Sequence, residues 1–271
     1  VASTMPIAPG THVVYTVRSG DSLYTIANQL GTNVPALIQA NALYPPVTDP
    51  DLIYPGQVIV ARVPGMNQQS TVLYQVAQGD TLFRIGERFS AGVDMLAALN
   101  QLQDPDFLRV AQLLFIPAFV YEVEPGDSLF RISRRFGVSL TELVRANRNR
   151  PGLSPDLIYP GFRLVVPLPT STNIAVFQPL PGTKIAPGQR LSGVARAFEA
   201  TIQYQIRDAA VRVVTRERAV TTSEGAPAFG RYDVAIAFDQ TPTTGTGTLM
   251  VYTRSARDGS IQDLVEAPVA F

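Results

Sequence analysis

A single pattern occurs three times in the first 167 residues of this chain. Its centre is the tetrapeptide Gly-Asp-Ser/Thr-Leu, which begins at Gly20, Gly79 and Gly126. A short segment containing tyrosine precedes each tetrapeptide, and an asparagine lies 21 residues after each of the three glycines. Three matches in the same register constitute a repeat, so this part of the chain must fold as an array of small modules rather than around one large core.

The third copy predicts the fold of one module. Residues 120–123 alternate between apolar and polar side chains as a short strand does, and the glycine after them permits a sharp turn. A helix should follow, capped by Asp127 or Ser128, because apolar residues recur at helical spacing. A Ser-x-x-Glu capping box at 139–142 begins a second helix, and residues 163–167 form a closing strand. Each copy is therefore predicted to be a βααβ module, a two-stranded sheet covered by two helices.

The repeat resembles the LysM module, a small βααβ domain that binds N-acetylglucosamine-containing glycans such as peptidoglycan and chitin. The resemblance rests on the Tyr-x-Val strand, on Gly-Asp-Ser/Thr-Leu, on the helix-ending asparagine, and on Asp-Leu-Ile-Tyr-Pro-Gly at 51–56 and 156–161. Three motifs in register are far more specific than one. The predicted modules are residues 12–62, 72–118 and 119–167.

The resemblance implies a glycan site between the Gly-Asp-Ser/Thr turn and the loop before the last strand. Backbone groups that the turn leaves unpaired can meet the amide of an N-acetyl group, while aliphatic and aromatic side chains pack on its methyl and on the sugar. The aspartate of each turn is equally compatible with a helix cap. The second copy has Arg109-Val110-Ala111 in place of Tyr-Pro-Gly and is predicted to bind more weakly. The predicted glycan-binding residues are Gly20, Asp21, Ser22, Leu52, Ile53, Tyr54, Gly126, Asp127, Ser128, Leu157, Ile158 and Tyr159, with a weaker set at Gly79, Asp80 and Thr81.

Other residues near the turns are predicted to be buried. The leucine of each turn and the isoleucine three residues later belong to the apolar stripe of the first helix. These residues are Leu23, Ile26, Leu82, Ile85, Leu129 and Ile132. The aromatic residues that follow the leucines, Tyr24, Phe83 and Phe130, are also predicted to lie in the core. Gly137 is placed to end the first helix of copy three in a left-handed conformation.

The connections between modules differ in length. Residues 62–71 are polar and rich in turn formers, which predicts a true linker between copies one and two. Copies two and three are joined by almost nothing at 116–121, so they should hold a fixed relative orientation. A proline-rich break at 167–173 marks another boundary.

From Ile174 onward the apolar residues alternate with a period of two. The predicted strands are 175–177, 190–196, 201–207, 211–220, 232–238, 246–254 and 261–271. Seven short strands favour an immunoglobulin-like β-sandwich at 174–271, and Asp258-Gly259 predicts a two-residue hairpin loop. The segment resembles the immunoglobulin-like Gmad2 domain of bacterial spore germination proteins, through its sequences at 176–182, 191–195, 245–249 and 255–260. This resemblance implies an exported bacterial protein. The predicted fold class is α+β, three LysM-like modules followed by the sandwich.

The sequence argues against catalysis. Gly-Asp-Ser-Leu also occurs in a family of serine esterases, but such an enzyme needs a histidine base downstream of the serine. The single histidine of the sequence, His12, precedes every copy. A metal hydrolase would need histidine or cysteine ligands that the sequence lacks, and no carboxylate pair stands in a recognisable glycosidase pattern. The spacing of Asp208, Asp233 and Asp239 matches no calcium loop. No catalytic residue, metal site or cofactor is predicted.

Charge and composition argue against nucleic acid and membranes as partners. The sequence has 22 Lys+Arg and 22 Asp+Glu, so there is no basic field to attract nucleic acid or an anionic membrane. No apolar run reaches the roughly 18 residues of a membrane span. The sequence does not begin with methionine, which suggests a processed product whose signal peptide has been removed.

These observations predict a non-catalytic extracellular or cell-wall protein. It would bind peptidoglycan or another N-acetylglucosamine polymer through the modules and present the immunoglobulin-like domain as an interaction domain. The alternative is an extracellular structural subunit, in which modules and sheet edges mediate self-association or contact with a cell-surface protein.

Overall fold

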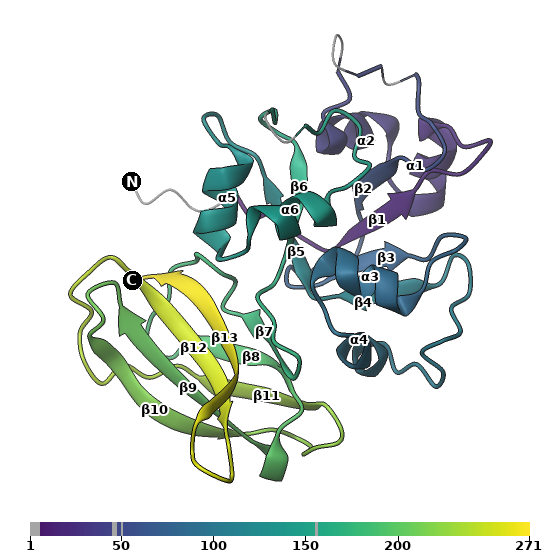
Figure 1. Cartoon of the computed structure of the whole chain (residues 1–271). Helices are drawn as coiled ribbons and strands as arrows, with labels where there is room; N and C mark the ends of the chain where they lie inside the picture. Colours follow the sequence, from purple (N-terminus) through teal and green to yellow (C-terminus); the bar gives the residue numbers. More distant parts are fainter. Residues whose placement is uncertain (1–5, 45–47, 50, 155–156) are drawn as a thin grey trace. The chain divides into compact units, whose positions relative to one another are not determined.

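A computed structural model of the protein describes residues 6–44, 48–49, 51–154 and 157–271 (Figure 1). Close packing of the backbone divides the chain into two compact units. The first consists of Val1–Phe89, Asp104–Ser133 and Ser139–Pro167, and the second of Ser90–Gln103, Arg134–Val138 and Leu168–Phe271. The predicted α+β class is confirmed, since helix-strand repeats are followed by antiparallel sheets.

Each repeat has the order strand, helix, helix, strand. Copy one consists of β1 (His12–Thr16), α1 (Leu23–Leu30), α2 (Val34–Asn41) and β2 (Val58–Arg62). Copy two consists of β3 (Val72–Gln75), α3 (Leu82–Phe89), α4 (Val93–Leu99) and β4 (Leu113–Ile116). Copy three consists of β5 (Ala118–Glu122), α5 (Leu129–Phe136), α6 (Leu140–Ala146) and β6 (Arg163–Pro167). The first and last strands of each copy pair antiparallel.

The helix ends follow from local sequence. Ser22 forms a capping box at the start of α1, and Ser139 forms the predicted box with Glu142 at the start of α6. Gly31 and Gly137 follow the first helices of their copies with φ values of 68° and 69°, the left-handed conformation predicted for Gly137. The six leucine and isoleucine residues of the predicted stripe are all buried, with exposed fractions from 0 to 6%.

In copies one and three, the asparagine at the end of the second helix connects that helix to the last strand. In copy one the Asn41 side chain donates to the carbonyl oxygens of Leu37 and Val60 at 2.8 and 2.9 Å and accepts from the Val60 N–H at 2.8 Å. Asn147 makes the equivalent three bonds to α6 and β6. Because a buried amide requires its hydrogen bonds, the 21-residue spacing from glycine to asparagine is a packing constraint.

Copies one and two share one sheet. β1 pairs parallel with β3, which gives the strand order β2-β1-β3-β4. Residues 63–71 connect the two copies without regular structure, and the pairing of β1 with β3 places the two copies side by side. Within this connection Gln68 exchanges hydrogen bonds with the Thr11 side chain at 3.0 and 3.1 Å. The segment before β1 contacts copy three, where the Ala8 N–H donates to the Val120 carbonyl at 2.8 Å.

Two buried arginines also join the copies. Arg150, which follows α6, donates to Oδ1 of Asn41 at 2.8 Å and to a backbone carbonyl of β6 at 2.9 Å. Its guanidinium lies 4.4 Å from the ring centre of Phe162. Arg88, in the last turn of α3, donates to two backbone carbonyls of copy three at 3.2 Å each. The repeats are therefore joined by buried hydrogen bonds as well as by strand pairing.

The C-terminal segment forms two antiparallel sheets. One has the order β11-β8-β7 and the other has the order β10-β9-β12-β13. The strands are β7 (Ile174–Gln178), β8 (Arg190–Ala195), β9 (Thr201–Asp208), β10 (Val213–Thr221), β11 (Gly230–Ala235), β12 (Thr246–Arg254) and β13 (Ile261–Ala270), with a short 3₁₀ helix at Phe198–Ala200. A single buried cluster takes residues from all seven strands. The seven predicted strands are all present, and β9 alternates between half-buried and buried residues as a sandwich strand does.

The hairpin between β12 and β13 differs from the prediction. The Asp-Gly pair at 258–259 predicted a two-residue loop, but the N–H of Ser255 donates to the carbonyl of Ser260 at 2.9 Å, which makes the loop longer. The carboxylate of Asp258 accepts from both the N–H and the hydroxyl of Ser260. These side-chain bonds hold a wider turn, so the prediction of a two-residue loop was wrong.

Two segments of the repeats belong to the second unit. Residues 90–103 include α4, and Met95 of this helix is buried against β7 and β8. The hydroxyl of Thr170 donates to the carbonyl of Ser90 at 2.7 Å. Thr170, which lies in the proline-rich break, is therefore hydrogen-bonded within this unit. A domain boundary there stays a prediction.

Candidate functional site

Two loops meet at one end of the strand pair in each copy. Loop A joins the first strand to the first helix (residues 17–22, 76–81 and 123–128), and loop B precedes the last strand (residues 52–57, 107–112 and 157–162). In copy one the Val17 N–H donates to the Gln57 carbonyl at 2.8 Å, and the Gly56 N–H donates to the Val17 carbonyl at 2.9 Å. Copies two and three repeat both bonds at 2.8 to 2.9 Å. The two loops therefore form one unit with the same backbone pairing three times.

The tyrosine and the aspartate of the motif shape loop A. The Oδ2 atom of Asp21 accepts from the Tyr15 hydroxyl and from the Arg18 N–H, each at 2.7 Å. The equivalent pairs are Tyr74–Asp80 at 2.8 Å and Tyr121–Asp127 at 2.5 Å. Burial, together with the bond to Asp21, raises the pKa of Tyr15 to about 12. The aspartate thus ties the turn to the strand, and the alternative that it caps the first helix was wrong.

The rest of loop A leaves backbone groups open. The cap of each first helix is the hydroxyl of the next residue, which accepts the N–H three residues later at 3.2 Å in Ser22, Thr81 and Ser128. The turn glycines Gly20, Gly79 and Gly126 have φ values of 86°, 83° and 86°, which favour glycine. Within the described part of the chain, their N–H groups have no acceptor, and a Cβ added at any of them would meet nothing within 4 Å. No other described segment therefore packs against the Cα of these three glycines.

Aromatic side chains project from the first helices beside loop A. Tyr24, Phe83 and Phe130 are 69%, 61% and 58% exposed, so the prediction that they lie in the core was wrong. Each follows a buried leucine, and one helical step of about 100° carries the next side chain out of the buried stripe. Their occurrence at the same position of all three copies is the sequence signal that could have identified them.

Loop B supplies further apolar surface. Leu52, Tyr54 and Leu157 are 55%, 57% and 51% exposed. Ile53 is half-buried against the core of copy one, so it anchors the loop. Ile158 and Tyr159 are half-buried in copy three, and Asp156 of the same motif lies outside the described residues. The predicted site residues of copies one and three therefore all lie on loops A and B, next to the exposed aromatic side chains.

Loop B of copy two keeps this backbone despite its different sequence. Ala111 has a φ value of 69° where the other copies have glycine at 90° and 85°. The Arg109 N–H donates to Oε1 of Gln112 at 3.0 Å, as the Tyr54 N–H does to the glutamine of its own loop at 2.9 Å. Arg109 therefore occupies the position that Tyr54 occupies in copy one.

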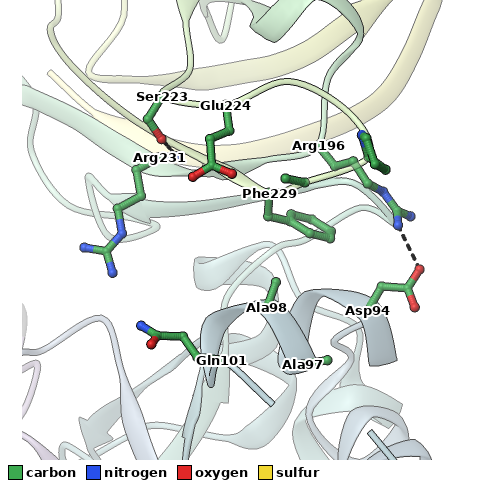
Figure 2. A pocket seen from close by; sticks show the side chains of 11 residues that line it. Asp94, Ala97, Ala98, Gln101, Arg196, Ser223, Glu224, Phe229 and Arg231 are labelled. Atoms are coloured by element: carbon green, nitrogen blue, oxygen red, sulfur yellow. Dashed lines mark hydrogen bonds and ion pairs between the residues drawn. The ribbon is translucent and has the colours of Figure 1, made fainter. Parts of the chain in front are cut away.

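A separate hollow of about 600 Å³ lies in the second unit, between α4 and the loop that precedes β11 (Figure 2). Arg196 donates to Asp94 at 2.8 Å and lies 5.0 Å from the ring centre of Phe229, while Glu224 projects over the opening. Sequence reasoning missed this hollow because its residues come from distant segments without a shared motif. In the described residues no group of three acidic, histidine or cysteine side chains could hold a metal ion, and no helix is long and apolar enough to cross a membrane.

The repeats and the sandwich each match a family model. The LysM domain model matches residues 15–62, 74–117 and 121–167, just over half of the chain. The chain belongs to the LysM family. A second model, the immunoglobulin-like domain of bacterial spore germination (Gmad2), matches residues 173–260. This protein is thus a tandem LysM chain whose three modules are followed by a Gmad2 domain.

Similar proteins share parts of this LysM chain. The secreted LysM effector ECP6 of Passalora fulva is 29% identical over 115 residues, which are 42% of this chain and 49% of that protein. The probable autolysin SsaALP of Staphylococcus aureus is 35% identical over 99 residues, which are 33% of this chain and 35% of that protein. The spore cortex-lytic enzyme SleL of Bacillus cereus, a solved structure, is 31% identical with a TM-score of 0.29, over 39% of this chain and 22% of its own. The chain therefore spans half or less of the length of these proteins.

Proposed function

We propose that this LysM protein binds an N-acetylglucosamine-containing glycan, peptidoglycan or a chitin-like polymer, through loops A and B of its modules. The observation that carries the proposal is the threefold recurrence of one surface. Each copy combines a turn glycine whose N–H has no acceptor among the described residues with an aromatic side chain that is more than half exposed.

The chemistry of the two loops suits an N-acetylated sugar. Free backbone N–H groups of loop A can donate to an acetamido carbonyl, and each such bond adds only about 1 kcal/mol net. The aromatic ring at Tyr24, Phe83 or Phe130 can pack on the apolar face of a pyranose ring or on the acetyl methyl. The predicted contacts of Gly20, Asp21, Ser22 and residues 52–54, and of their counterparts in copy three, belong to this proposal.

The number of modules follows from weak single sites. Linked sites convert later binding steps into intramolecular ones, which can raise avidity by roughly 10²–10⁴-fold where the geometry permits. A polymer with a repeating sugar offers many equivalent positions to such a protein. Strand pairing and buried hydrogen bonds between the repeats fix the distances between their sites. Avidity should therefore depend on how well the spacing of sugars along the polymer matches those distances.

The proposal also covers where the protein acts and what the Gmad2 domain does. We infer a non-catalytic, exported protein of the cell wall or extracellular space, in which the modules anchor the chain and the Gmad2 domain contacts another molecule. The secreted effector and the autolysin named above support a location outside the cell, because both share LysM sequence with this chain.

Sedimentation of the full chain with insoluble peptidoglycan or chitin tests glycan binding. The wild type should be retained, and Tyr24→Ala combined with Phe130→Ala should weaken retention about tenfold, if each ring contributes about 0.7 kcal/mol. Phe198→Ala is the matched control, since Phe198 is 68% exposed in the second unit and outside every module. Equal retention of all three proteins would reject the aromatic contacts, and no retention of the wild type would reject glycan binding.

The structural alternative has its own readout in the same preparations. A self-assembling subunit would show particle growth with concentration in light scattering, without added glycan. Growth without glycan retention would favour the structural subunit, whereas retention by a monodisperse protein would favour the proposal above.

A further inference from the structure

Copy two has two arginines near its loops that copy one lacks, and it has Ala77 on loop A where copy one has Arg18. Arg109 stands on loop B where copy one has Tyr54, and the Arg84 side chain donates to the Gly79 carbonyl of loop A at 3.4 Å. The residue of copy one that corresponds to Arg84 is Thr25, which serves its capping box instead. Copy three is intermediate, because it keeps a tyrosine on loop B and has the arginine on α5.

The acidic pair that precedes loop B is the same in both copies. Asp104 accepts from the Asp106 N–H at 2.9 Å, and the equivalent pair in copy one, Asp49 and Asp51, makes the same bond at 2.9 Å. On the first helix, copy two has Glu87 where copy one has Asn28, so the charge that distinguishes the two loops B is that of Arg109 alone. Loop B of copy two is therefore more positive than loop B of copy one by the full charge of Arg109.

Copy two also keeps the apolar part of the site. Phe83, Phe107 and Val110 are 61%, 62% and 56% exposed. Ala111 retains the left-handed conformation although that conformation costs a residue with a Cβ about 1 kcal/mol. The loop has thus preserved its shape while exchanging a tyrosine for a cation, which fits a change of ligand better than a loss of the site.

We propose that copy two selects an acidic N-acetylated glycan, one whose sugars carry carboxylate groups, whereas copy one prefers a neutral polymer. This inference rests on the proposed glycan function. The guanidinium of Arg109 would pair with the ligand carboxylate, since arginine presents donors in a planar fork that matches a carboxylate. In peptidoglycan such a carboxylate comes from the lactyl ether of muramic acid or from the attached peptide.

The expected preference is modest and sensitive to salt. A solvent-exposed ion pair changes affinity by about twofold to fivefold, and salt at about 0.5 M should remove most of that difference. Neutral chitin oligomers carry no carboxylate, so their binding should not depend on salt in this way.

NMR titration of the full chain can follow the copies separately. The amide signals of Gly79 and Ala111 report on copy two, and those of Gly20 and Gly56 report on copy one. The three probes are chitin oligomers, alternating N-acetylglucosamine–N-acetylmuramic acid strands with a free lactyl carboxylate, and the same strands carrying peptides. The copy-two signals should saturate at a lower concentration of an acidic strand than of chitin, and the copy-one signals should not. The better of the two acidic strands identifies the source of the carboxylate.

Two exchanged variants provide the decisive comparison. Arg109→Tyr, which copies Tyr54, should abolish the acidic preference of copy two, and Tyr54→Arg should confer one on copy one. Both positions are exposed, and an unchanged melting temperature would show that each variant is folded. An acidic preference that survives Arg109→Tyr, or that is absent in the wild type while chitin still binds, would overturn this inference and leave the proposed function standing. Absence of binding to every glycan would reject the proposed function itself.

Discussion

Among single residues, the buried Arg150 is unusual because all of its described hydrogen-bond partners are neutral groups. Arg150 is bonded to an asparagine oxygen and a backbone carbonyl, and within the described contacts it forms no ion pair. Burial, and then the charge of Arg88, lowers the pKa of Arg150 to about 9, so it remains charged at neutral pH. The interior therefore disfavours any further positive charge.

His12 is the group that should respond to this environment. It is 2% exposed, and its pKa is lowered from 6.5 to about 4, first by burial and then by the charge of Arg163. Since the folded pKa lies below the unfolded one, its contribution to stability is complete above pH 6.5 and is lost as pH falls toward 4. The loss should amount to about 3 kcal/mol at pH 4.

Urea unfolding of the wild type and of His12→Gln between pH 7 and pH 4 measures this loss. Carboxylates titrate in both proteins, so the difference between the two free-energy curves isolates the histidine. The wild type should lose stability more steeply than the variant over this range. Parallel curves would show that His12 reaches solvent or a partner when it is protonated.

At the level of the elements, the glycines that end α1 and α5 form a natural comparison. Both are left-handed, at 68° and 69°, but their surroundings differ. A Cβ on Gly31 would lie 3.6 Å from the ring of Pro64, an ordinary contact, whereas a Cβ on Gly137 would lie 2.8 Å from the ring of Pro268. The end of α5 is thus packed against β13, and the end of α1 is not packed closely.

Alanine substitutions should separate backbone strain from crowding. Gly31→Ala should cost about 1 kcal/mol for the left-handed conformation alone, and Gly137→Ala should cost a further 1–3 kcal/mol, roughly, for overpacking against the proline. Urea unfolding of the full chain would give both values. Equal losses would mean that Pro268 moves aside, and no loss in either variant would contradict the left-handed helix ends.

The elements also show what a sequence can and cannot predict. The stripe of leucine and isoleucine predicted the buried face of each first helix, and period-two alternation predicted all seven sandwich strands, because both patterns are local. The prediction that Tyr24, Phe83 and Phe130 are buried was wrong because it rested on their hydrophobic character alone. Each lies one helical step, about 100°, away from the buried leucine before it. The sharing of a sheet by β1 and β3 could not be predicted, since no local pattern encodes pairing between separate copies.

For the candidate site, the sequence predicted where the loops lie but not what each of their residues does. The motif identified loops A and B, but the roles of its residues depend on tertiary contacts. Asp21 was predicted to contact a ligand or to cap a helix, but one of its carboxylate oxygens accepts the hydrogen bond of the Tyr15 hydroxyl. In copy two the sequence change at 109–111 predicted weaker binding, and the structure shows that the backbone bonds of the loop are retained.

In the molecule as a whole, the repeats of the first unit are joined to one another and are not independent modules on a flexible chain. The parallel pairing of β1 with β3 and the bond from Arg150 to Asn41 connect copy one to both later copies. The connection at 63–71 is one of several links rather than the sole tether.

Cutting that connection should therefore not release copy one. A protease site inserted between Gln69 and Ser70 would be cleaved in the folded protein, because this segment is exposed or half-buried. The two fragments should elute together in size-exclusion chromatography without denaturant and separate in urea. An uncut sample carrying the same insertion is the control. Separation without denaturant would show that the shared sheet is too weak to hold the copies together.

The strand pairing of copy three has a mechanical consequence. β5 and β6 pair from Ala118↔Pro167 to Glu122↔Arg163, and loops A and B lie beyond the second of these pairs. A tensile load that enters at loop A through a bound polymer and leaves along the chain after Pro167 would pull β5 and β6 in opposite directions along the strands. All five paired positions would then resist in shear at once, whereas a pull between Ala118 and Pro167 would peel them apart one by one. Copy three should therefore withstand a larger force under the first kind of load than under the second.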